Sequence, residues 1–308
     1  MAAGRNAYDL VVVGGGINGA GIARDAAGRG LNVLLCEKDD LASHTSSWSS
    51  KLIHGGLRYL EYYEFRLVRE ALIEREVLLR AAPHLIKPLT FVLPHSREQR
   101  PRWMLRIGLF LYDHLGGRKL LAPSRAEDLR AGVYGAPLED AYPRGFSYAD
   151  AWVDDSRLVV ANAQAAAEMG AEVRTRTRCD HAERDDAGGW RITLADEETG
   201  VEETVSTRAL VNAAGPWVSR FIKDGLKVES KHRVRLVKGS HIVVPALYDG
   251  DHAYILQNDD QRIVFAIPYQ AGRLTIIGTT DLAYEGEPAA VEIDRDEIDY
   301  LCRVVNRY

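Results

Sequence analysis

The 308-residue sequence has few cysteines and no long apolar run. Its three cysteines lie far apart and form no CxxC pair, which excludes a disulfide framework and a cysteine-rich zinc site and favours a reducing compartment. No apolar stretch approaches the roughly 18 residues of a transmembrane helix, so we expect any membrane attachment to be peripheral. The first residues also lack the charged lead and apolar core of a secretory signal.

Neither sign of charge dominates. The formal net charge of −5 gives no general attraction to nucleic acid, so we expect no nucleic-acid partner. With 46% hydrophobic and 27% charged residues, the composition excludes disordered and fibrous classes. The length is sufficient for two domains.

The N-terminal segment predicts a strand, a helix and a second strand. Residues 8–13 form a short, β-branched apolar run that ends in glycines, which is typical of a buried parallel strand. An alanine-rich helix is expected at 18–29, followed by an apolar strand at 31–37. A Ser/Thr-rich loop at 43–56 comes next.

The middle of the chain mixes helical and strand patterns. In a helix predicted at 64–80, Phe65, Val68, Leu72 and Leu79 form one apolar stripe. Prolines and glycines interrupt the stretch from 87 to 145, which suggests an excursion from the first domain. The further predicted elements are a helix at 155–169 and strands at 171–178, 190–195 and 203–211.

The C-terminal pattern changes to alternating strands, in HIVVP, AYILQ, RIVFAIP and LTIIG, which predicts an antiparallel sheet. An amphipathic helix at 294–308 lacks an end cap, and we interpret it as a fragment boundary. The whole pattern predicts an α/β fold with two domains. A Rossmann-like βαβ domain takes residues 1–85 and 146–230, and a cap domain with an antiparallel sheet takes 86–145 and 231–308.

The strongest motif is GGGING, in which Gly14, Gly16 and Gly19 satisfy GxGxxG between the first strand and helix. Gly14 makes the tight turn, Gly16 lets the backbone approach a pyrophosphate, and Gly19 lets the helix pack closely. Glu37 ends the second strand, where an acidic residue accepts ribose hydrogen bonds and repels the extra phosphate of NADP.

The Ser/Thr loop favours a flavin over NAD, because a nicotinamide domain usually continues with another regular βα unit. Such a loop can line an extended cofactor, although a solvated surface loop has the same composition. Its polar members are Thr45, Ser46, Ser47, Ser49, Ser50 and Lys51.

Longer motifs carry a family resemblance. They are GGGINGAGIARDAAGRG, TSSWSSKLIHGGLRYLEYYEFRLVREALIEREVLL, WVDDSRLVVANA, VNAAGPWV, VKGSHIVVP and IIGTTD. Together they resemble the FAD-dependent glycerol-3-phosphate dehydrogenases, through essentially the whole chain. The resemblance implies an FAD-binding fold of the glutathione-reductase or amino-acid-oxidase type. It also implies oxidation of sn-glycerol 3-phosphate to dihydroxyacetone phosphate, with electrons passed to membrane quinone. A cytoplasmic protein, peripheral on the inner membrane and forming a homodimer, is expected.

The resemblance also implies site residues. The ADP half of FAD is expected at Gly14, Gly16, Ile17, Asn18, Gly19, Glu37 and Lys38. The pyrophosphate and ribityl chain are expected along Thr45, Ser46, Ser47, Ser50, Lys51 and Leu52. A strand ending at Cys179 is expected to offer backbone groups to the adenine, and Ala214, Gly215 and Trp217 are expected to close over the cofactor. The family's FGGKLTTYR-like segment, expected beyond Tyr308, is absent.

Three candidate catalytic residues lie in the segment 54–59, which the resemblance implies beside the isoalloxazine and substrate. His54 can accept the hydroxyl proton, as histidines commonly do in catalysis, or it serves as a structural hydrogen-bonding residue. Arg58 can grip a phosphate with paired hydrogen bonds, or it lies on the surface at a helix start. Tyr59 can donate to the substrate oxygen or simply pack.

The segment 97–119 mixes arginines with aromatic and aliphatic residues. This pattern suits an anionic membrane surface, and a helix buried under the cap domain explains it equally well. Two other functions compete with the dehydrogenase: an amino-acid or amine oxidase of the same broad fold, and a non-catalytic dinucleotide-binding or redox-sensing module. No metal site is expected.

Overall fold

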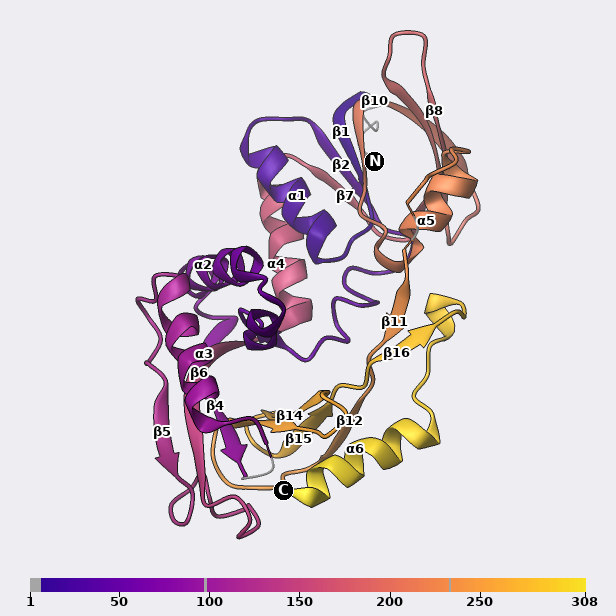
Figure 1. The fold of residues 1–308 in the computed structure, drawn as a ribbon. Helices are drawn as coiled ribbons and strands as arrows, with labels where there is room; N and C mark the ends of the chain where they lie inside the picture. The colour runs from indigo at the N-terminus through magenta and orange to yellow at the C-terminus, as the bar shows by residue number, and fades with distance from the viewer. Residues whose placement is uncertain (1–6, 97–98, 233) are drawn as a thin grey trace. The chain divides into compact units, whose positions relative to one another are not determined.

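The computed structural model describes residues 7–96, 99–232 and 234–308. Arg97, which belongs to the predicted basic segment, lies outside these ranges, as do the first six residues. The described chain forms two compact units, each assembled from separate stretches of sequence (Figure 1). The first unit takes residues 7–49, 154–236 and 286–289, and the second takes 50–153, 237–285 and 290–308.

The first unit contains a six-stranded sheet in the order β7-β2-β1-β10-β9-β8. Strands β7, β2, β1 and β10 pair in parallel, whereas β9 and β8 continue the sheet in antiparallel fashion. The strands are β1 (Ala7–Val13), β2 (Val33–Cys36), β7 (Glu172–Arg174), β8 (Thr177–Arg184), β9 (Trp190–Asp196) and β10 (Glu202–Asn212).

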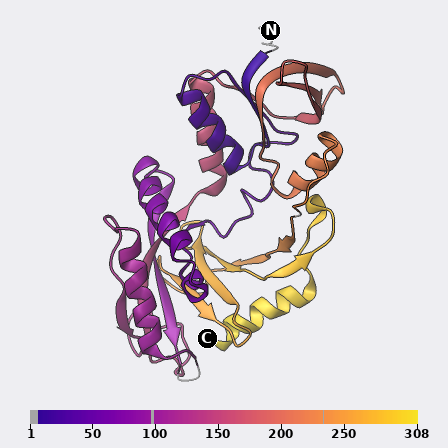
Figure 2. The same cartoon turned by 45° about the horizontal axis from the view of Figure 1, so that its top comes forward.

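Two alanine-rich helices, α1 (Ile17–Gly28) and α4 (Asp155–Glu168), lie side by side in this unit (Figures 1 and 2). Their small side chains allow close packing, and Ala23 and Ala163 are both buried in one core cluster with strand residues such as Val33. Asp154 caps α4 by accepting a hydrogen bond from the amide of Arg157. The βαβ unit is therefore confirmed, within one or two residues of its predicted bounds.

The second unit contains a larger sheet in the order β12-β15-β14-β13-β4-β6-β3, with β5 paired to β6. Its pairs are antiparallel except for β13 with β4. The strands are β3 (Leu52–Ile53), β4 (Ile86–His95), β5 (Arg125–Asp128), β6 (Arg144–Val153), β12 (His241–Pro245), β13 (Ala253–Gln257), β14 (Ile263–Tyr269) and β15 (Leu274–Gly278). The predicted antiparallel sheet is confirmed for β12 to β15.

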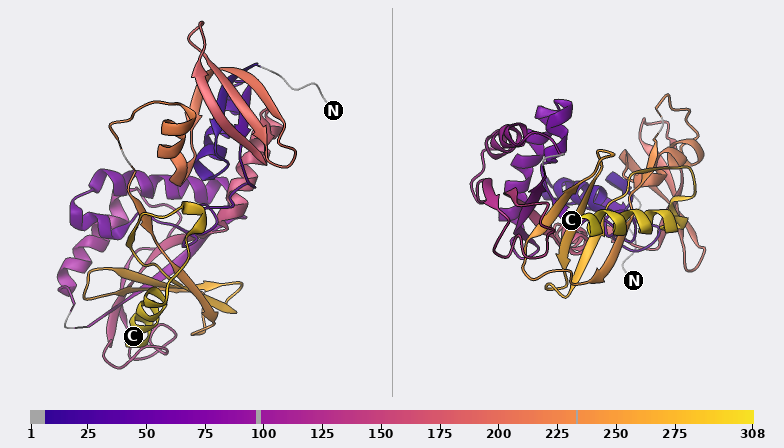
Figure 3. Two further views of the ribbon diagram at one scale, coloured as in Figure 1. Left: turned by 90° about the vertical axis from the view of Figure 1, so that its right-hand side faces the viewer. Right: turned by 60° about the horizontal axis from the view of Figure 1, so that its bottom comes forward.

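Three helices cover this second sheet: α2 (Phe65–Ala81), α3 (Arg102–Leu115) and α6 (Arg295–Arg307). Figure 3 shows α6, in yellow, lying across the C-terminal strands of this sheet, and the helix buries Leu301 and Val304 in the core shared with them. A capping box between Asp294 and Glu297 fixes its N-terminus. Short strands β11 (Leu236–Lys238) and β16 (Leu282–Tyr284) form a separate pair.

The unit boundaries differ from the predicted domains at residues 50–85 and 146–153, which belong to the second unit, and at 231–236 and 286–289, which belong to the first. The reason is that β3 pairs with β6, and α2 buries Val68 and Leu72 in the core of the large sheet.

Strand β4 contains two prolines, Pro88 and Pro94, although proline cannot donate a backbone hydrogen bond to a neighbouring strand. The strand accommodates them because it pairs with β13 only at Phe91 and Val92, so both proline positions are unpaired on that side.

The apolar stripe of α2 differs at its start, where Phe65 is 40% exposed, while Val68, Leu72 and Leu79 are buried. Within the described ranges, no helix is both long and apolar enough to span a membrane.

Candidate functional site

The glycine-rich turn connects β1 to α1 and has two glycines that the fold itself requires. Gly14 has a φ of +111°, and a Cβ on it would lie 2.4 Å from the carbonyl oxygen of Ala213. A Cβ on Gly19 would lie 1.8 Å from the carbonyl oxygen of Gly14. These two glycines thus close the turn and bring the helix against the strand, in the roles predicted for them.

Gly16 is different, because little in the protein fills the space beside it. A Cβ on Gly16 would approach only the hydroxyl of Ser46, at 3.0 Å, and its backbone is extended, with φ −80° and ψ −176°. The fold would therefore tolerate a side chain here. The open face of Gly16 fits a group that must approach the backbone closely, such as a pyrophosphate.

Helix α1 begins at this turn without a charged cap. Gly16 is its N-cap and has no side chain, and the first turn of the helix carries no acidic residue. The amide of Ile17 donates to the hydroxyl of Ser46 at 3.0 Å, which ties the loop after β2 to the helix start. The positive end of the helix dipole is thus not neutralised by a carboxylate of its own first turn, as an anion site requires.

Glu37 follows β2 and is buried, with 8% of its surface exposed. One carboxylate oxygen accepts the amide of Gly15 at 2.6 Å, and the other accepts the amide of Asp39 at 2.9 Å. Each oxygen has a second lone pair, so the carboxylate can still accept from a sugar hydroxyl. The two amides hold the side chain in place before any ligand arrives.

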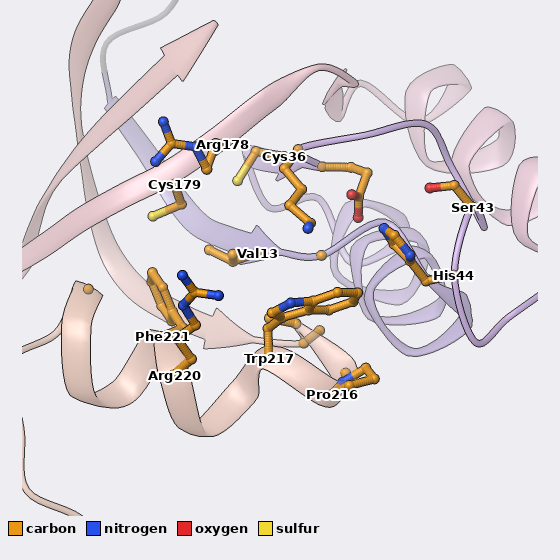
Figure 4. Close-up of a pocket in the computed structure, with 18 of the residues that line it drawn as sticks. Val13, Cys36, Ser43, His44, Arg178, Cys179, Pro216, Trp217, Arg220 and Phe221 are labelled. Atoms are coloured by element: carbon orange, nitrogen blue, oxygen red, sulfur yellow. The ribbon is translucent and has the colours of Figure 1, made fainter. Parts of the chain in front are cut away.

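A cavity of about 520 Å³ opens at this turn, entirely within the first unit (Figure 4). This volume is in the range of cofactor and small-molecule pockets. Ten of the predicted cofactor residues line it: Gly14, Gly16, Glu37, Lys38, Thr45, Ser46, Cys179, Ala214, Gly215 and Trp217.

One wall of the cavity is formed by the turn η2 (Gly215–Trp217) and the helical segments that follow it. Figure 4 shows Trp217 beside His44, and their rings meet edge to face at 4.6 Å. The ammonium of Lys38 lies 4.1 Å from the Trp217 ring, and the indole N–H donates to Glu287 at 2.9 Å. These contacts fix an aromatic plane at the edge of the pocket.

The opposite wall carries Cys36 and Cys179 (Figure 4). Burial raises the pKa of both thiols, that of Cys179 to about 12, so neither is a thiolate at neutral pH. They act as small apolar groups. Neither Cys36 nor Cys179 therefore provides a reactive thiolate in this pocket.

The prediction that a strand ends at Cys179 is wrong. The chain turns at Arg176, whose φ is +52°, and Cys179 lies inside β8. A β-bulge between Cys179 and His181 leaves Asp180 out of register with β9, and Asp180 also lines the cavity. The predicted role, backbone groups offered to a ligand, stays a prediction for this bulge.

Several predicted cofactor residues do not line this cavity. The amide of Ile17 binds Ser46 while its side chain is 38% exposed, and Gly19 serves helix packing. Asn18 is an exposed residue of the first turn of α1, and Ser47 hydrogen-bonds the carbonyl of His44. Ser50, Lys51 and Leu52 belong to the second unit.

In the second unit, the hydroxyl of Ser50 lies 2.8 Å from Nε2 of His241. Burial, and then the nearby Lys51 charge, lower the pKa of His241, so its imidazole is neutral at physiological pH. The ammonium of Lys51 lies 6.0 Å from the ring of Tyr269, and Leu52 pairs with Trp152 in the sheet. Sequence reasoning did not include His241, because its strand gave only a β pattern.

The three predicted catalytic residues lie around one turn after β3. The amide of Gly56, whose φ is +69°, donates to Nδ1 of exposed His54 at 3.1 Å. Arg58 and Tyr59 lie on the short helix η1 (Leu57–Tyr62). The guanidinium of Arg58 is 3.4 Å from the hydroxyl of Tyr62, and Tyr59 is 49% exposed.

Other cavity residues were missed by sequence reasoning. Arg178 neighbours Cys179, and Arg220 and Phe221 follow Trp217 at helical spacing, so the motifs around them could have suggested these three. Glu287 had no such signal, because it reaches the cavity from a distant part of the chain, where it pairs with Arg220 at 3.1 Å.

Glu37, Asp39 and His44 place possible metal-ligand atoms within 4.8 Å of one another. Their contacts already explain the cluster, because Glu37 accepts two backbone amides and His44 lies 2.6 Å from the Asp39 carboxylate. Burial opposes the charge of Asp39, but the hydrogen bond from His44 and the Lys38 charge outweigh it and lower the pKa of Asp39. We therefore propose no metal here.

Comparison with known proteins gives a consistent result. The family model described as FAD dependent oxidoreductase matches residues 9–308. A glycerol-3-phosphate dehydrogenase of Pseudomonas aeruginosa is 62% identical over 98% of this chain and 58% of its own length. A D-erythritol 1-phosphate dehydrogenase of Brucella abortus is 59% identical over 97% of this chain and 59% of its own length.

Among solved structures, a glycerol-3-phosphate dehydrogenase from Bacillus halodurans, complexed with FAD, has a TM-score of 0.72 and 29% identity. The match covers 98% of this chain and 53% of that protein. The present chain thus spans a little more than half of the length of these relatives.

Proposed function

This chain belongs to the FAD dependent oxidoreductase family, and we propose that it contributes the FAD site of an enzyme that oxidises sn-glycerol 3-phosphate to dihydroxyacetone phosphate. The observation that carries the proposal is the cavity at the start of α1, where Gly16 leaves backbone space and Glu37 is held by two amides. The 62% identity to a glycerol-3-phosphate dehydrogenase supports the substrate.

The residues of the cavity fit the ADP portion of FAD. The N-terminus of α1, whose first turn carries no acidic side chain, would hold the pyrophosphate, and Glu37 would accept a hydrogen bond from the ribose. The bulge at Cys179 and the Trp217 wall would enclose the rest of the nucleotide. Thr45 and Ser46, which line the cavity, would donate hydrogen bonds from their hydroxyl groups to the phosphates.

When bound, FAD supplies a two-electron acceptor for the carbon-bound hydrogen of the substrate alcohol. Arg58 would bind the substrate phosphate, because a guanidinium can make paired hydrogen bonds to it. Tyr59, whose side chain is half exposed, would contact the same substrate.

The hydrogen bond at His54 restricts its role. A backbone amide can only donate, so the contact with Gly56 makes Nδ1 the acceptor and leaves the proton of the neutral ring on Nε2. To accept the hydroxyl proton at Nε2, the ring would need the opposite tautomer and would lose the Gly56 bond. We therefore propose that His54 orients the substrate oxygen as a hydrogen-bond donor and that the hydroxyl proton leaves to water, in place of the predicted role of His54 as base.

We propose that electrons pass on to a quinone at a membrane surface, as the family resemblance implies. Helix α3 supports this placement, since Leu109 and Tyr112 are buried while Trp103, Ile107 and Phe110 are 66%, 52% and 54% exposed. The buried face fits the predicted alternative of a buried helix, and we propose that the exposed face contacts the membrane surface. Replacing the three exposed residues by serine should reduce binding to anionic lipid vesicles, whereas Val201→Ser, at a position 65% exposed in the other unit, should not.

D-Erythritol 1-phosphate is a second candidate substrate, because the Brucella abortus relative is 59% identical. Both compounds are polyol phosphates, so the same phosphate and hydroxyl contacts serve either. The test is to identify the cofactor that the denatured full-length protein releases, and then to compare kcat/KM for the two compounds. Released FAD and a preference for glycerol 3-phosphate support the proposal; bound NAD alone, or turnover only of amines, contradicts it.

A further inference from the structure

A buried polar cluster lies beneath the turn that carries His54. It joins Arg75 of α2, Tyr112 of α3 and Asp150 of β6, all within the second unit. The guanidinium of Arg75 forms a salt bridge with the Asp150 carboxylate, and the side chains of both residues are only 3% exposed. The hydroxyl of Tyr112 lies 2.9 Å from each oxygen of the same carboxylate.

The surroundings of the cluster are apolar, since Leu72, Phe91 and Tyr148 belong to the same core. Burial raises the pKa of Asp150, while the charge of Arg75 and the hydrogen bonds from Arg75 and Tyr112 oppose that rise. A buried ion pair is weak evidence for added stability, because desolvation of the two charges offsets much of their attraction. A contribution to the stability of the fold therefore does not by itself explain why this charged cluster is buried here.

The hydrogen bonds of the cluster have one direction. Burial raises the pKa of Tyr112 well above its ordinary value, so its hydroxyl keeps its proton. That single proton points to Asp150, and the hydroxyl oxygen is left to accept. The amide of Gly55 donates to it at 2.6 Å. The order Gly55 to Tyr112 to Asp150 follows because a peptide N–H cannot accept.

The turn itself is pressed against the helices that carry the cluster. A Cβ on Gly55 would lie 2.4 Å from the side chain of Leu72 and 2.9 Å from the Tyr112 hydroxyl. The next amide, that of Gly56, donates to Nδ1 of His54. Two successive amides of one turn are therefore held by hydrogen bonds: that of Gly55 by the buried Tyr112 hydroxyl, and that of Gly56 by the His54 imidazole.

We propose that Tyr112, oriented by Asp150 and Arg75, is a positioning residue that holds the 54–56 turn so that His54 presents its Nε2 proton to the substrate oxygen. The proposal rests on the proposed function, since it assigns a partner to a residue of that site. Tyr112 acts through His54 and needs no contact with the substrate.

The test is a double-mutant cycle on flavin reduction in the natural full-length protein loaded with FAD. Tyr112→Phe, His54→Ala and the double variant are mixed anaerobically with glycerol 3-phosphate. Tyr112→Phe should slow flavin reduction by about 10- to 100-fold, because a small displacement of a reacting geometry has effects of that size. In the His54→Ala background the same change should slow it by less than about 3-fold, since the two residues act as a unit.

Tyr148→Phe is the matched control, because Tyr148 is a buried tyrosine whose ring meets that of Tyr112 at 5.8 Å. No hydrogen bond joins its hydroxyl to the turn among the described residues. It should leave the rate within about 3-fold of wild type. Flavin content should stay constant in all variants, because the FAD cavity described above lies in the first unit.

An equal slowing by Tyr112→Phe in both backgrounds, or no slowing at all, would overturn the proposal while leaving the proposed function intact. If Tyr112→Phe does not fold, Asp150→Asn replaces it in the cycle, with the same criterion. If wild-type flavin is reduced by neither polyol phosphate, the proposed function fails, and the positioning proposal fails with it.

Discussion

Gly16 offers the sharpest test of where the cofactor phosphates bind. A valine at this position should leave the protein folded but remove the space for a pyrophosphate. Its backbone is in an extended conformation that any residue adopts, and the new Cβ would meet only the Ser46 hydroxyl. Loss of a favourable helix N-cap and a shift of Ser46 should cost about 1 to 2 kcal/mol of stability.

The expected loss of binding is larger. Hydrogen bonds from backbone amides to a charged phosphate contribute about 1.5 to 3 kcal/mol each. Blocking one or two of them at Gly16 should weaken FAD binding by about 1.5 to 6 kcal/mol, which is at least about 10-fold. The assay is titration of the apoprotein with FAD, followed by protein fluorescence, together with the melting temperature of each variant.

Two other glycines of the same segment separate folding from binding. Gly21→Ala is the control, because the space beside Gly21 is open and alanine favours a helix, so FAD binding should be unchanged and stability slightly higher. Gly14→Ala should instead destabilise the fold, because its Cβ would clash with Ala213. If Gly16→Val bound FAD as tightly as wild type, the phosphates would lie elsewhere and the site assignment would be refuted.

Three further changes test other parts of the site. Arg58→Ala should keep FAD but weaken transition-state binding of glycerol 3-phosphate by about 2 to 4 kcal/mol, with partial recovery in Arg58→Lys; an unchanged kcat/KM would make Arg58 structural. Glu37→Gln should lower the free energy of unfolding by about 1 to 3 kcal/mol and weaken FAD binding, because one buried amide loses its acceptor; equal melting temperature and affinity would contradict this. His241 has a lowered pKa, so the unfolded chain gains a proton more readily than the folded protein as pH falls below about 6.5. Stability should therefore fall between about pH 7 and pH 5, and His241→Gln should remove part of that slope in thermal unfolding; an identical slope would show that His241 does not contribute.

The parts of the fold that could be predicted were those with local signals. The apolar strand, the glycines and the alanine-rich helix follow one another within about 30 residues, as the βαβ unit requires. Gly14, Gly19 and Glu37 accordingly lie where expected. The alternating strands of the second sheet were predictable for the same reason.

What could not be predicted depends on contacts between distant segments. Residues 50–85 resemble a continuation of the first domain, but pairing of β3 with β6 places them in the second unit. Arg75 lies on the buried face of α2 because it forms a salt bridge with Asp150, which lies on a strand far along the chain. Glu287 reaches the cavity in the same way, with no local pattern to announce it.

If this chain holds the flavin of an enzyme that takes electrons from glycerol 3-phosphate, that substrate should reduce the bound flavin. The most direct measurement is the visible absorption spectrum of the natural full-length protein, recorded without oxygen before and after glycerol 3-phosphate is added. We expect an oxidised flavin spectrum that bleaches on addition of glycerol 3-phosphate and returns when an electron acceptor is admitted. A flavin that glycerol 3-phosphate leaves oxidised, or a protein that carries no flavin, would contradict it.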